Sequence, residues 1–418
     1  MIRWLWGLLL IGLWMQGRAA DTWPQWRGPT RDGQVSGPAW PETLQGAALT
    51  QRWQVSLEPG YSGPIVTPDR VFTTETVDKK LERVRALDRT TGRELWRQEW
   101  EGAMSVPFFA RSNGDWIRAT PAWDGETLYV AGMRDVLVAL DAQTGAVRWR
   151  KDFVEELKSP VPAFGFVSSP LVVGDALYVQ AGGGVMRLEK ATGKIVWRSL
   201  ESTDGMMGSA FSSPMLATVA GRPQLIVQTR TELVGLNPES GAVLWQQPVE
   251  AFRGMNILTP TAVGNRIFTS AYGGKTLAYD IQETNGSYRA EPAWEFKAQG
   301  YMTSPVIVNG FAYLHLRNQR ALCINVATGQ EQWTTGDSFG KYWSLVAQGD
   351  RILALDQKGE LLLLRANPEK FTLIDRRKVS EEESWAHVAV VGEDVYIRDL
   401  KGLTAWVWSA TPAKSAAR

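Results

Sequence analysis

The chain has 418 residues, 45 basic and 44 acidic side chains, and a high content of tryptophan (20) and glycine (40). The formal net charge of +1 provides no basic excess to neutralise a phosphate backbone, which argues against nucleic acid as the main partner. Many aromatic residues with regularly placed glycine favour short strands joined by tight turns over a helical protein.

The first 19 residues have the pattern of a secretory signal peptide. Arg3 supplies a positive charge, residues 4–15 are apolar, and Gly17 and Ala19 are the small residues expected before a cleavage site. The apolar run is short for a membrane span. We therefore expect a periplasmic or secreted protein. No cysteine follows the apolar stretch, so we expect no lipid anchor there.

After a predicted N-terminal arm at residues 20–50, the chain repeats the phrase Ala-x-Asp-x-x-Thr-Gly-x-x-x-Trp. The phrase is complete at residues 86–96 and 139–149, and later copies keep only some of its positions. A second phrase, a small or polar residue followed by proline, precedes each of six copies, and two degenerate versions follow. The six pairs are Gly63-Pro64, Thr120-Pro121, Ser169-Pro170, Ser213-Pro214, Thr259-Pro260 and Ser304-Pro305.

Each unit is predicted to form four short strands. The Asp or Asn side chain of the turn bonds the backbone two residues on, and the following Gly accepts a positive φ. Four strands in about 45 residues is the period of a propeller blade. The eighth unit, residues 385–408, supplies only three strands, so we expect the lone strand at residues 51–57, which carries Trp53, to complete it and close the ring.

The sequence thus predicts an all-β fold: an eight-bladed β-propeller of four-stranded antiparallel blades, closed by an N-terminal strand. The propeller is assigned to residues 51–408, preceded by the signal at 1–19 and the arm at 20–50. Residues 409–418 are expected to be a flexible tail. We expect the protein to be a monomer.

The repeat resembles the PQQ-type repeat of quinoprotein alcohol dehydrogenases and of the BamB family of outer-membrane assembly propellers. Eight units with closure by a terminal strand look more like the BamB type. Residues 23–33 also look like the start of mature PQQ-like propellers from planctomycete-type bacteria. The resemblance to quinoprotein dehydrogenases implies a cofactor that is covered by a disulfide of adjacent cysteines and bound to a calcium ion. Cys323 is the only cysteine here, so the cofactor is not carried over.

Most chemically suggestive residues have a structural interpretation. The repeat tryptophans are expected to pack between neighbouring blades. Asp88 and Asp141 are expected to bond the backbone of their turns, and Cys323 takes the alanine position of its repeat. With two histidines and no His-Glu-x-x-His, Cys-x-x-Cys or EF-type loop, we predict no metal and no cofactor.

The connections between each repeat tryptophan and the next proline must open on one face of the disc, around the central channel. They are rich in aromatic side chains with a few Arg, Lys and His, as is typical of a ligand site. The alternative is that these residues cap the core and each other. The predicted ligand-binding residues are Phe108, Trp116, Phe166, Met207, Phe252, Arg253, Asn256, Tyr301, Lys341, Tyr342, Trp343, Trp385 and His387.

Three functions follow from these observations. The leading hypothesis is a non-catalytic scaffold that binds a protein segment or a polysaccharide at this mouth. The second is a polysaccharide lyase or hydrolase, in which His387 or Tyr342 acts as general base and Arg253 or Lys341 neutralises a carboxylate. The third is a PQQ-dependent dehydrogenase.

Overall fold

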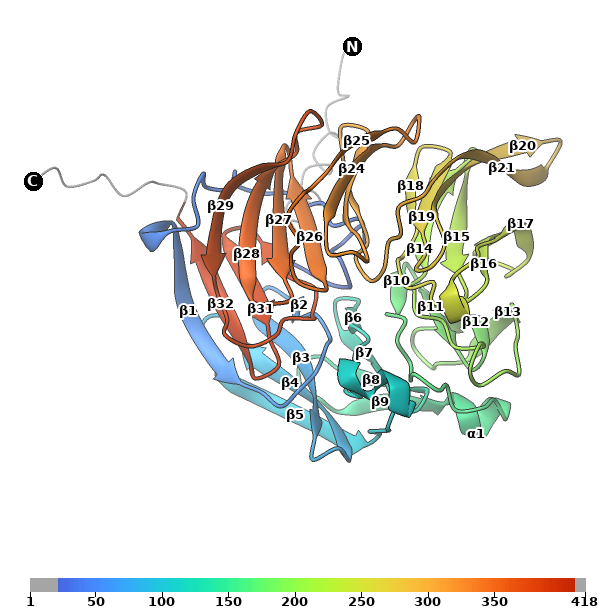
Figure 1. Cartoon of the computed structure of the whole chain (residues 1–418). Coiled ribbons are helices and arrows are strands. Elements are labelled where there is room, and N and C mark those ends of the chain that lie inside the picture. The colour runs from blue at the N-terminus through green and yellow to red at the C-terminus, as the bar shows by residue number, and fades with distance from the viewer. Residues whose placement is uncertain (1–21, 410–418) are drawn as a thin grey trace, which may run out of the picture.

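The computed structural model describes residues 22–409 and consists of eight four-stranded antiparallel sheets arranged as the blades of a propeller (Figure 1). This confirms the predicted fold. The predicted signal peptide and almost all of the predicted tail lie outside the described residues. The closing strand is also confirmed: β1 (Leu49–Ser56) pairs with β32 (Gly402–Trp408), and Figure 1 shows the blue first strand beside the red last one.

The first four blades each use four consecutive strands, from the channel outward. They are β2 (Ile65–Val66), β3 (Arg70–Val77), β4 (Leu81–Asp88) and β5 (Glu94–Glu101); β6 (Ala122–Trp123), β7 (Thr127–Gly132), β8 (Val136–Asp141) and β9 (Val147–Asp152); β10 (Leu171–Val173), β11 (Ala176–Ala181), β12 (Gly184–Glu189) and β13 (Ile195–Ser199); and β14 (Met215–Val219), β15 (Arg222–Gln228), β16 (Glu232–Leu236) and β17 (Val243–Pro248).

The remaining blades follow the same order, and the eighth is completed by β1. They are β18 (Thr261–Val263), β19 (Arg266–Ser270), β20 (Thr276–Thr284) and β21 (Ser287–Phe296); β22 (Val306–Val308), β23 (Phe311–His315), β24 (Ala321–Asn325) and β25 (Glu331–Thr334); β26 (Trp343–Gln348), β27 (Arg351–Asp356), β28 (Glu360–Arg365) and β29 (Thr372–Lys378); and β30 (Ala389–Val391), β31 (Asp394–Arg398) and β32. A short helical turn, η2 (Gly46–Ala48), precedes β1, and three more lie between blades: η3 (Phe108–Asn113), α1 (Phe153–Leu157) and η4 (Phe252–Gly254).

The repeat tryptophans join neighbouring blades. In the first copy the Trp96 ring packs on Phe72 of its own blade, and its Nε1 donates to the carbonyl of Ala142 in the turn of the next blade, at 3.1 Å. The glycine of that turn lies against the same ring. Five other repeat tryptophans donate to the next turn in the same way: Trp53, Trp149, Trp197, Trp294 and Trp333.

Trp245 departs from this pattern. Its Nε1 donates at 2.7 Å to Gln224 of its own blade. The reason lies in the fifth blade, where the short Thr-Gly turn is replaced by the long hairpin of β20 and β21, which projects from the disc (Figure 1). The turn that would accept the indole hydrogen is therefore absent at that junction.

A chain of hydroxyl groups links the inner strands and explains the second repeated phrase. The Ser or Thr before each proline accepts a hydrogen bond from the backbone amide at the matching position of the preceding blade, at 2.9–3.1 Å. Residues before proline adopt extended backbone, which presents both the amide and the side chain to the neighbours. The acceptors, in order, are Thr120, Ser169, Ser213, Thr259 and Ser304.

The N-terminal arm crosses the central channel before it joins the last blade. Trp23 pairs with Val66 of blade one, and the carbonyl of Pro24 accepts from Trp123 of blade two. Gly33 and Gln34 then reach Ala347 of blade seven. Through Arg31, which donates to the carbonyls of Ser169 and Pro170 before the inner strand of blade three, the arm also touches the side of the ring opposite blade seven. Within residues 22–409, no helix has the length and hydrophobicity needed to cross a bilayer.

Candidate functional site

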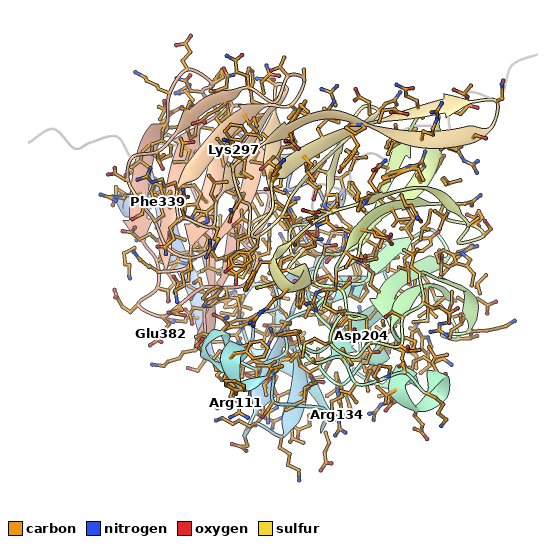
Figure 2. All side chains as sticks on the ribbon, turned by 45° about the vertical axis from the view of Figure 1, so that its right-hand side comes forward. Arg111, Arg134, Asp204, Lys297, Phe339 and Glu382 are labelled. Carbon is orange, nitrogen blue, oxygen red and sulfur yellow. The ribbon has the colours of Figure 1, made fainter. Side chains whose placement is uncertain are left out.

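A cavity of about 810 Å³ opens at the centre of one face of the disc, here called the mouth face. The face is built from the connections between each outer strand and the next inner strand. Arg111, Asp204, Phe339 and Glu382 come from four of these connections and all lie around this face (Figure 2). The expected convergence of the connections is therefore present, and the hydroxyl chain of the inner strands forms part of the cavity wall.

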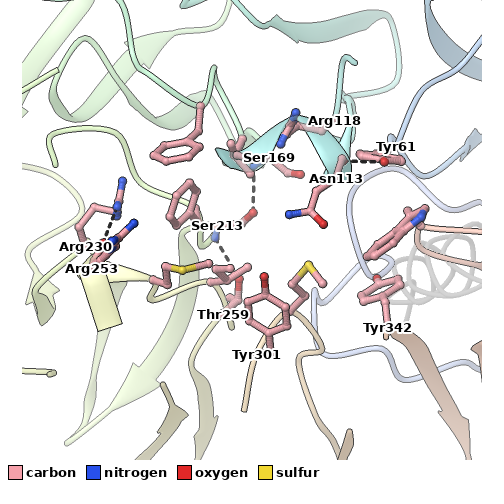
Figure 3. Close-up of a pocket in the computed structure, with 18 of the residues that line it drawn as sticks. Tyr61, Asn113, Arg118, Ser169, Ser213, Arg230, Arg253, Thr259, Tyr301 and Tyr342 are labelled. Carbon is pink, nitrogen blue, oxygen red and sulfur yellow. Dashed lines mark hydrogen bonds between the residues drawn. The ribbon is translucent and has the colours of Figure 1, made fainter. Parts of the chain in front are cut away.

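One side of the cavity is a row of phenylalanine rings. Phe109 from η3 contacts Phe164 edge to face at 6.2 Å between centroids, and Phe164 contacts Phe211 at 5.3 Å. Arg230 lies 4.2 Å above the Phe211 ring, and Arg253 lies 5.8 Å from the Phe109 ring. Figure 3 shows the two arginines side by side at this end of the cavity. A cation over the face of an aromatic ring is attracted to that ring, which stabilises the contact.

The opposite side is formed by larger rings. Trp385 stacks on Tyr342 with an interplanar angle of 14° and also contacts Tyr61 at 5.7 Å. The Tyr61 hydroxyl donates to the Asn113 carbonyl at 2.6 Å (Figure 3). Arg118 lies 5.9 Å from the Tyr61 ring. Each of these contacts joins residues from different blades, so the wall is held by the ring as a whole.

The floor is supplied by the arm. Trp26 lines the cavity and contacts His387 edge to face at 6.0 Å. Beneath it lie Arg27 and Arg31, each 5.5 Å from the Trp26 ring and at most 3% exposed. Arg31 donates to the carbonyls of Ser169 and Pro170, and Arg27 donates to Asp32 and Pro305. Backbone carbonyls, rather than carboxylates, hold these two guanidinium groups in place.

Burial shapes the electrostatics of the site. Removal from water lowers the pKa of Arg31 to about 9 and that of Arg27 to about 10. The pKa of Arg230 falls to about 10 for the same reason. Burial, with the adjacent Arg27 charge, lowers the pKa of His387 to about 3, so its imidazole is neutral at physiological pH. The cavity is therefore positive through its arginines and not through histidine.

Seven of the thirteen residues proposed from the sequence line the cavity. They come from several connections and include the stacked pair on the side opposite the phenylalanines. These residues are Met207, Phe252, Arg253, Tyr301, Tyr342, Trp385 and His387.

Three of the thirteen are buried away from the mouth, which corrects their assignment as ligand contacts. Asn256 is fully buried and donates to the carbonyls of Arg230 and Val249, so it fixes the loop. Trp343 is 2% exposed because its indole donates to Asp356 inside blade seven. Phe166 packs in the core between the second and third blades.

The other three lie outside the cavity lining. Phe108 is 81% exposed on the rim and packs only its edge on Phe109. Trp116 packs behind Tyr61, at 5.3 Å, and so supports the wall from outside. Lys341 is exposed to solvent and is not among the residues of the cavity.

Sequence reasoning missed Trp26 and Arg230 as cavity residues. Arg230 lies in the turn between β15 and β16, so it belongs to none of the connections that were predicted to form the site. A signal did exist, because the turns between second and third strands open on the same face as those connections. Trp26 lies in the conspicuous aromatic segment at residues 23–33, whose place on the disc has no local determinant.

The residues of the cavity do not fit a PQQ–calcium group. Calcium is bound by oxygen ligands, above all carboxylates, and no Asp or Glu lines the cavity in the described part of the chain. Within residues 22–409, no three His, Cys, Asp or Glu side chains gather to hold a metal ion. Cys323 is buried in blade six. A general base with a pKa of about 3, as in His387, also gives little support to lyase chemistry.

Comparisons with known proteins agree with the fold. The family model described as outer membrane protein assembly factor BamB matches residues 80–335. BamB of Moranella endobia (strain PCIT) is 23% identical over 65% of this chain, and BamB of Yersinia pestis is 21% identical over 61%. The matched regions span 66% and 62% of these two relatives, slightly less than two thirds.

Solved structures show the same architecture at low identity. The crystal structure of BamB from Moraxella catarrhalis superposes with a TM-score of 0.63 and 18% identity, covering 86% of this chain and all of that one. The quinohemoprotein alcohol dehydrogenase ADHIIG of Pseudomonas putida HK5 gives a TM-score of 0.60 at 13% identity, covering 96% of this chain and 82% of that chain. At these identities, the likeness concerns the fold alone.

Proposed function

Since the chain belongs to the family of outer membrane protein assembly factor BamB, we propose that it is an exported, non-catalytic scaffold that holds a protein segment at the mouth of the propeller. Its place of action in this proposal is the periplasm, in the assembly of outer membrane proteins. The family supports the scaffold role, and the mouth face supports the position of the bound segment.

The observation that carries the proposal is the exposed apolar rim. Among the described residues, the large exposed apolar side chains other than valine and leucine all lie at the mouth: Phe108, Phe109, Met206 and Phe252, which are 41–81% exposed. Three exposed valines, by contrast, lie on the outer strands β9, β13 and β17. Apolar patches of aromatic and methionine side chains mark interaction surfaces.

The shape of the rim favours an extended protein segment over a small ligand. A second cavity of about 690 Å³ adjoins the first and shares Met207, Arg230, Phe252 and Arg253 with it. A chain several residues long can therefore occupy both cavities across the ridge of η4. Methionine side chains adapt to varied apolar partners, and Met206, Met207, Met255 and Met302 all line the first cavity. This composition favours a protein segment over a polysaccharide.

The test is site-specific crosslinking with binding measurements. A photoreactive residue at Phe252 or Phe109 should crosslink extended peptides taken from strands of outer-membrane β-barrels. The same residue at Val196, which is 45% exposed on an outer strand, should not. Replacing both phenylalanines by alanine should weaken peptide binding at least about tenfold, because aromatic anchors each contribute ~1–2 kcal/mol. Equal crosslinking at Val196 and Phe252, or unchanged affinity in the double variant, contradicts the proposal.

A further inference from the structure

Among the described residues, the lining of the first cavity carries positive charge and no carboxylate. Arg118, Arg230 and Arg253 line the cavity, and no Asp or Glu among the described residues does. None of the three arginines forms an ion pair with a carboxylate of residues 22–409. Three arginines around one cavity whose lining holds no carboxylate form a candidate site for an anionic group.

Two more guanidinium groups add to this charge from below. Arg27 and Arg31 lie beneath Trp26, almost fully buried, and the Nε of each has no hydrogen-bond partner in the described structure. The nearest acids lie outside the cavity lining. They are Asp32 beside Arg27, Asp115 beside Arg118, Asp204 beside Arg230, and Glu383, which accepts from Trp385.

The three wall arginines differ in how freely they can bind. Arg230 donates from all three nitrogens to the carbonyls of Met206, Arg253 and Gly254, which fixes its charge in place. Arg118 donates from Nε and one terminal nitrogen to the carbonyls of Trp116 and Gly114, which leaves its other terminal nitrogen for a ligand. Arg253 makes no side-chain hydrogen bond with the described residues and is exposed over Phe252, 5.2 Å from the ring.

On the premise of the proposed function, we infer that the protein segment bound at the mouth is both acidic and apolar: a peptide in which carboxylates alternate with aromatic or aliphatic side chains. A carboxylate that reaches Arg253, or the free terminal nitrogen of Arg118, gains a charge-assisted hydrogen bond. The side chains on either side of it meet the phenylalanine row and the methionines. In extended backbone, successive side chains point to opposite faces, so a bound segment can reach the arginines and aromatic rings that lie on both sides of the cavity.

The second cavity shares Arg230 and Arg253 with the first, and its lining adds Arg317 and one carboxylate, that of Glu250. Only the lining of the first cavity is free of carboxylates among the described residues. We therefore expect the preference for an acidic segment to be strongest in the first cavity. A neutral oligosaccharide would give Arg118 and Arg253 no carboxylate partner, and it would place some of its hydroxyl groups against methionine and phenylalanine, which offer no strong hydrogen-bond partner.

Isothermal titration of the full chain with three matched peptides tests the inference. The peptides have the same length and the same alternating phenylalanine and leucine residues, and carry Glu, Gln or Lys at the positions between them. The Glu peptide should bind about tenfold or more tightly than the Gln peptide, and the Lys peptide most weakly. The preference for Glu should shrink when NaCl is raised from about 0.1 M to about 1 M, because salt screens exposed charges.

Variants separate charge recognition from apolar binding. Arg253→Gln should reduce the ratio of Glu to Gln affinities several-fold with little change in affinity for the Gln peptide, and Arg118→Gln should act in the same direction. Arg289→Gln, at a side chain 76% exposed on the β20–β21 hairpin, is the matched control and should change nothing. Phe252→Ala should weaken the Glu and Gln peptides equally.

The outcomes are distinguishable. Equal affinity for the Glu and Gln peptides, or an Arg253→Gln variant that keeps the full preference, overturns the inference and leaves the proposed function standing. Binding of none of the peptides overturns both, and so does binding of a neutral oligosaccharide alone.

Discussion

Gly145 has a φ of +76°, and a Cβ atom at this position would lie 2.6 Å from the indole of Trp96. The backbone conformation and the neighbouring ring both require glycine there. The preceding Asp141 accepts hydrogen bonds from the amides of Gln143 and Thr144, which shapes the turn. The repeated phrase Asp-x-x-Thr-Gly…Trp therefore describes a contact between blades as well as a turn within one.

Gly145→Ala tests this double requirement against a matched glycine. Gly286 has nearly the same φ, +82°, but a Cβ atom added there would have nothing within 4 Å. Gly286→Ala should cost only the left-handed backbone penalty of ~1–2 kcal/mol. Gly145→Ala should add an overpacking penalty of ~1–3 kcal/mol. Thermal unfolding of both variants measures the difference. Equal midpoints would show that the Trp96 ring moves aside with no measurable loss of stability.

For single residues, the sequence predicts the role of repeat positions better than that of connection residues. Asp141 and the repeat tryptophans recur with fixed spacing, so their environment recurs too. Asn256 and Trp343 lie in irregular connections, where burial depends on partners from other segments: the carbonyls of Arg230 and Val249 for Asn256, and Asp356 for Trp343. The residue types suggested ligand contacts at these two positions, but their hydrogen bonds within the protein keep both side chains buried.

At the scale of elements, the inner strands are tied to one another by side chains rather than by a shared sheet. Each blade is a separate sheet, so backbone hydrogen bonds do not run around the ring. The hydroxyl chain from Thr120 to Ser304 supplies that link between six blades. The link between the seventh and eighth blades runs in the opposite direction. There the amide of Val388, in the later blade, donates to the Ser344 hydroxyl of the earlier blade.

Thr259→Val removes one link of this chain without changing the side-chain volume. The amide of Ser213, which donates to Thr259 at 2.9 Å in the interior, would lose its acceptor. An unpaired buried amide costs ~1–3 kcal/mol. Thr218→Val, at an exposed position of β14, serves as the control and should be neutral. A thermal midpoint for Thr259→Val equal to that of the control would show that the hydroxyl chain contributes nothing to stability.

The hairpin of β20 and β21 shows what element-level prediction could not supply. The insertion around Asn285-Gly286 was visible in the sequence. Its effect on the preceding blade was not visible there, because Trp245 matches the repeat as well as the other repeat tryptophans do. The change arises from the loss of an acceptor in the next blade, and that is a property of two blades together.

At the scale of the whole molecule, the fold could be predicted almost completely, while the path of the arm could not. Closure by β1 follows from counting strands in the eighth unit. The arm has no repeat and no alternation of its own, and its position depends on contacts with blades one, two, three, six and seven. Trp23, Arg27 and Arg31 are anchored by inner-strand carbonyls that every blade offers.

Deletion of residues 22–35 tests the placement of the arm. The amides of Val66, Trp123 and Ala347 donate to arm carbonyls at 2.7–3.0 Å. Without the arm these three amides should exchange hydrogen with solvent markedly faster, and the thermal midpoint should fall. The amide of Glu189, which donates within a turn of blade three, should be unaffected. Unchanged exchange at all three arm-bonded amides would show that the arm does not occupy the channel.

The floor formed by Trp26 has a kinetic consequence. Because the arm crosses the channel below it, a bound segment enters and leaves by the same opening. Nothing can be threaded through the disc, and a competitor cannot push the occupant out from behind. Exchange of one occupant for another must therefore take place at the mouth, where Phe109, Phe252 and Arg253 are among the contacts that set the residence time.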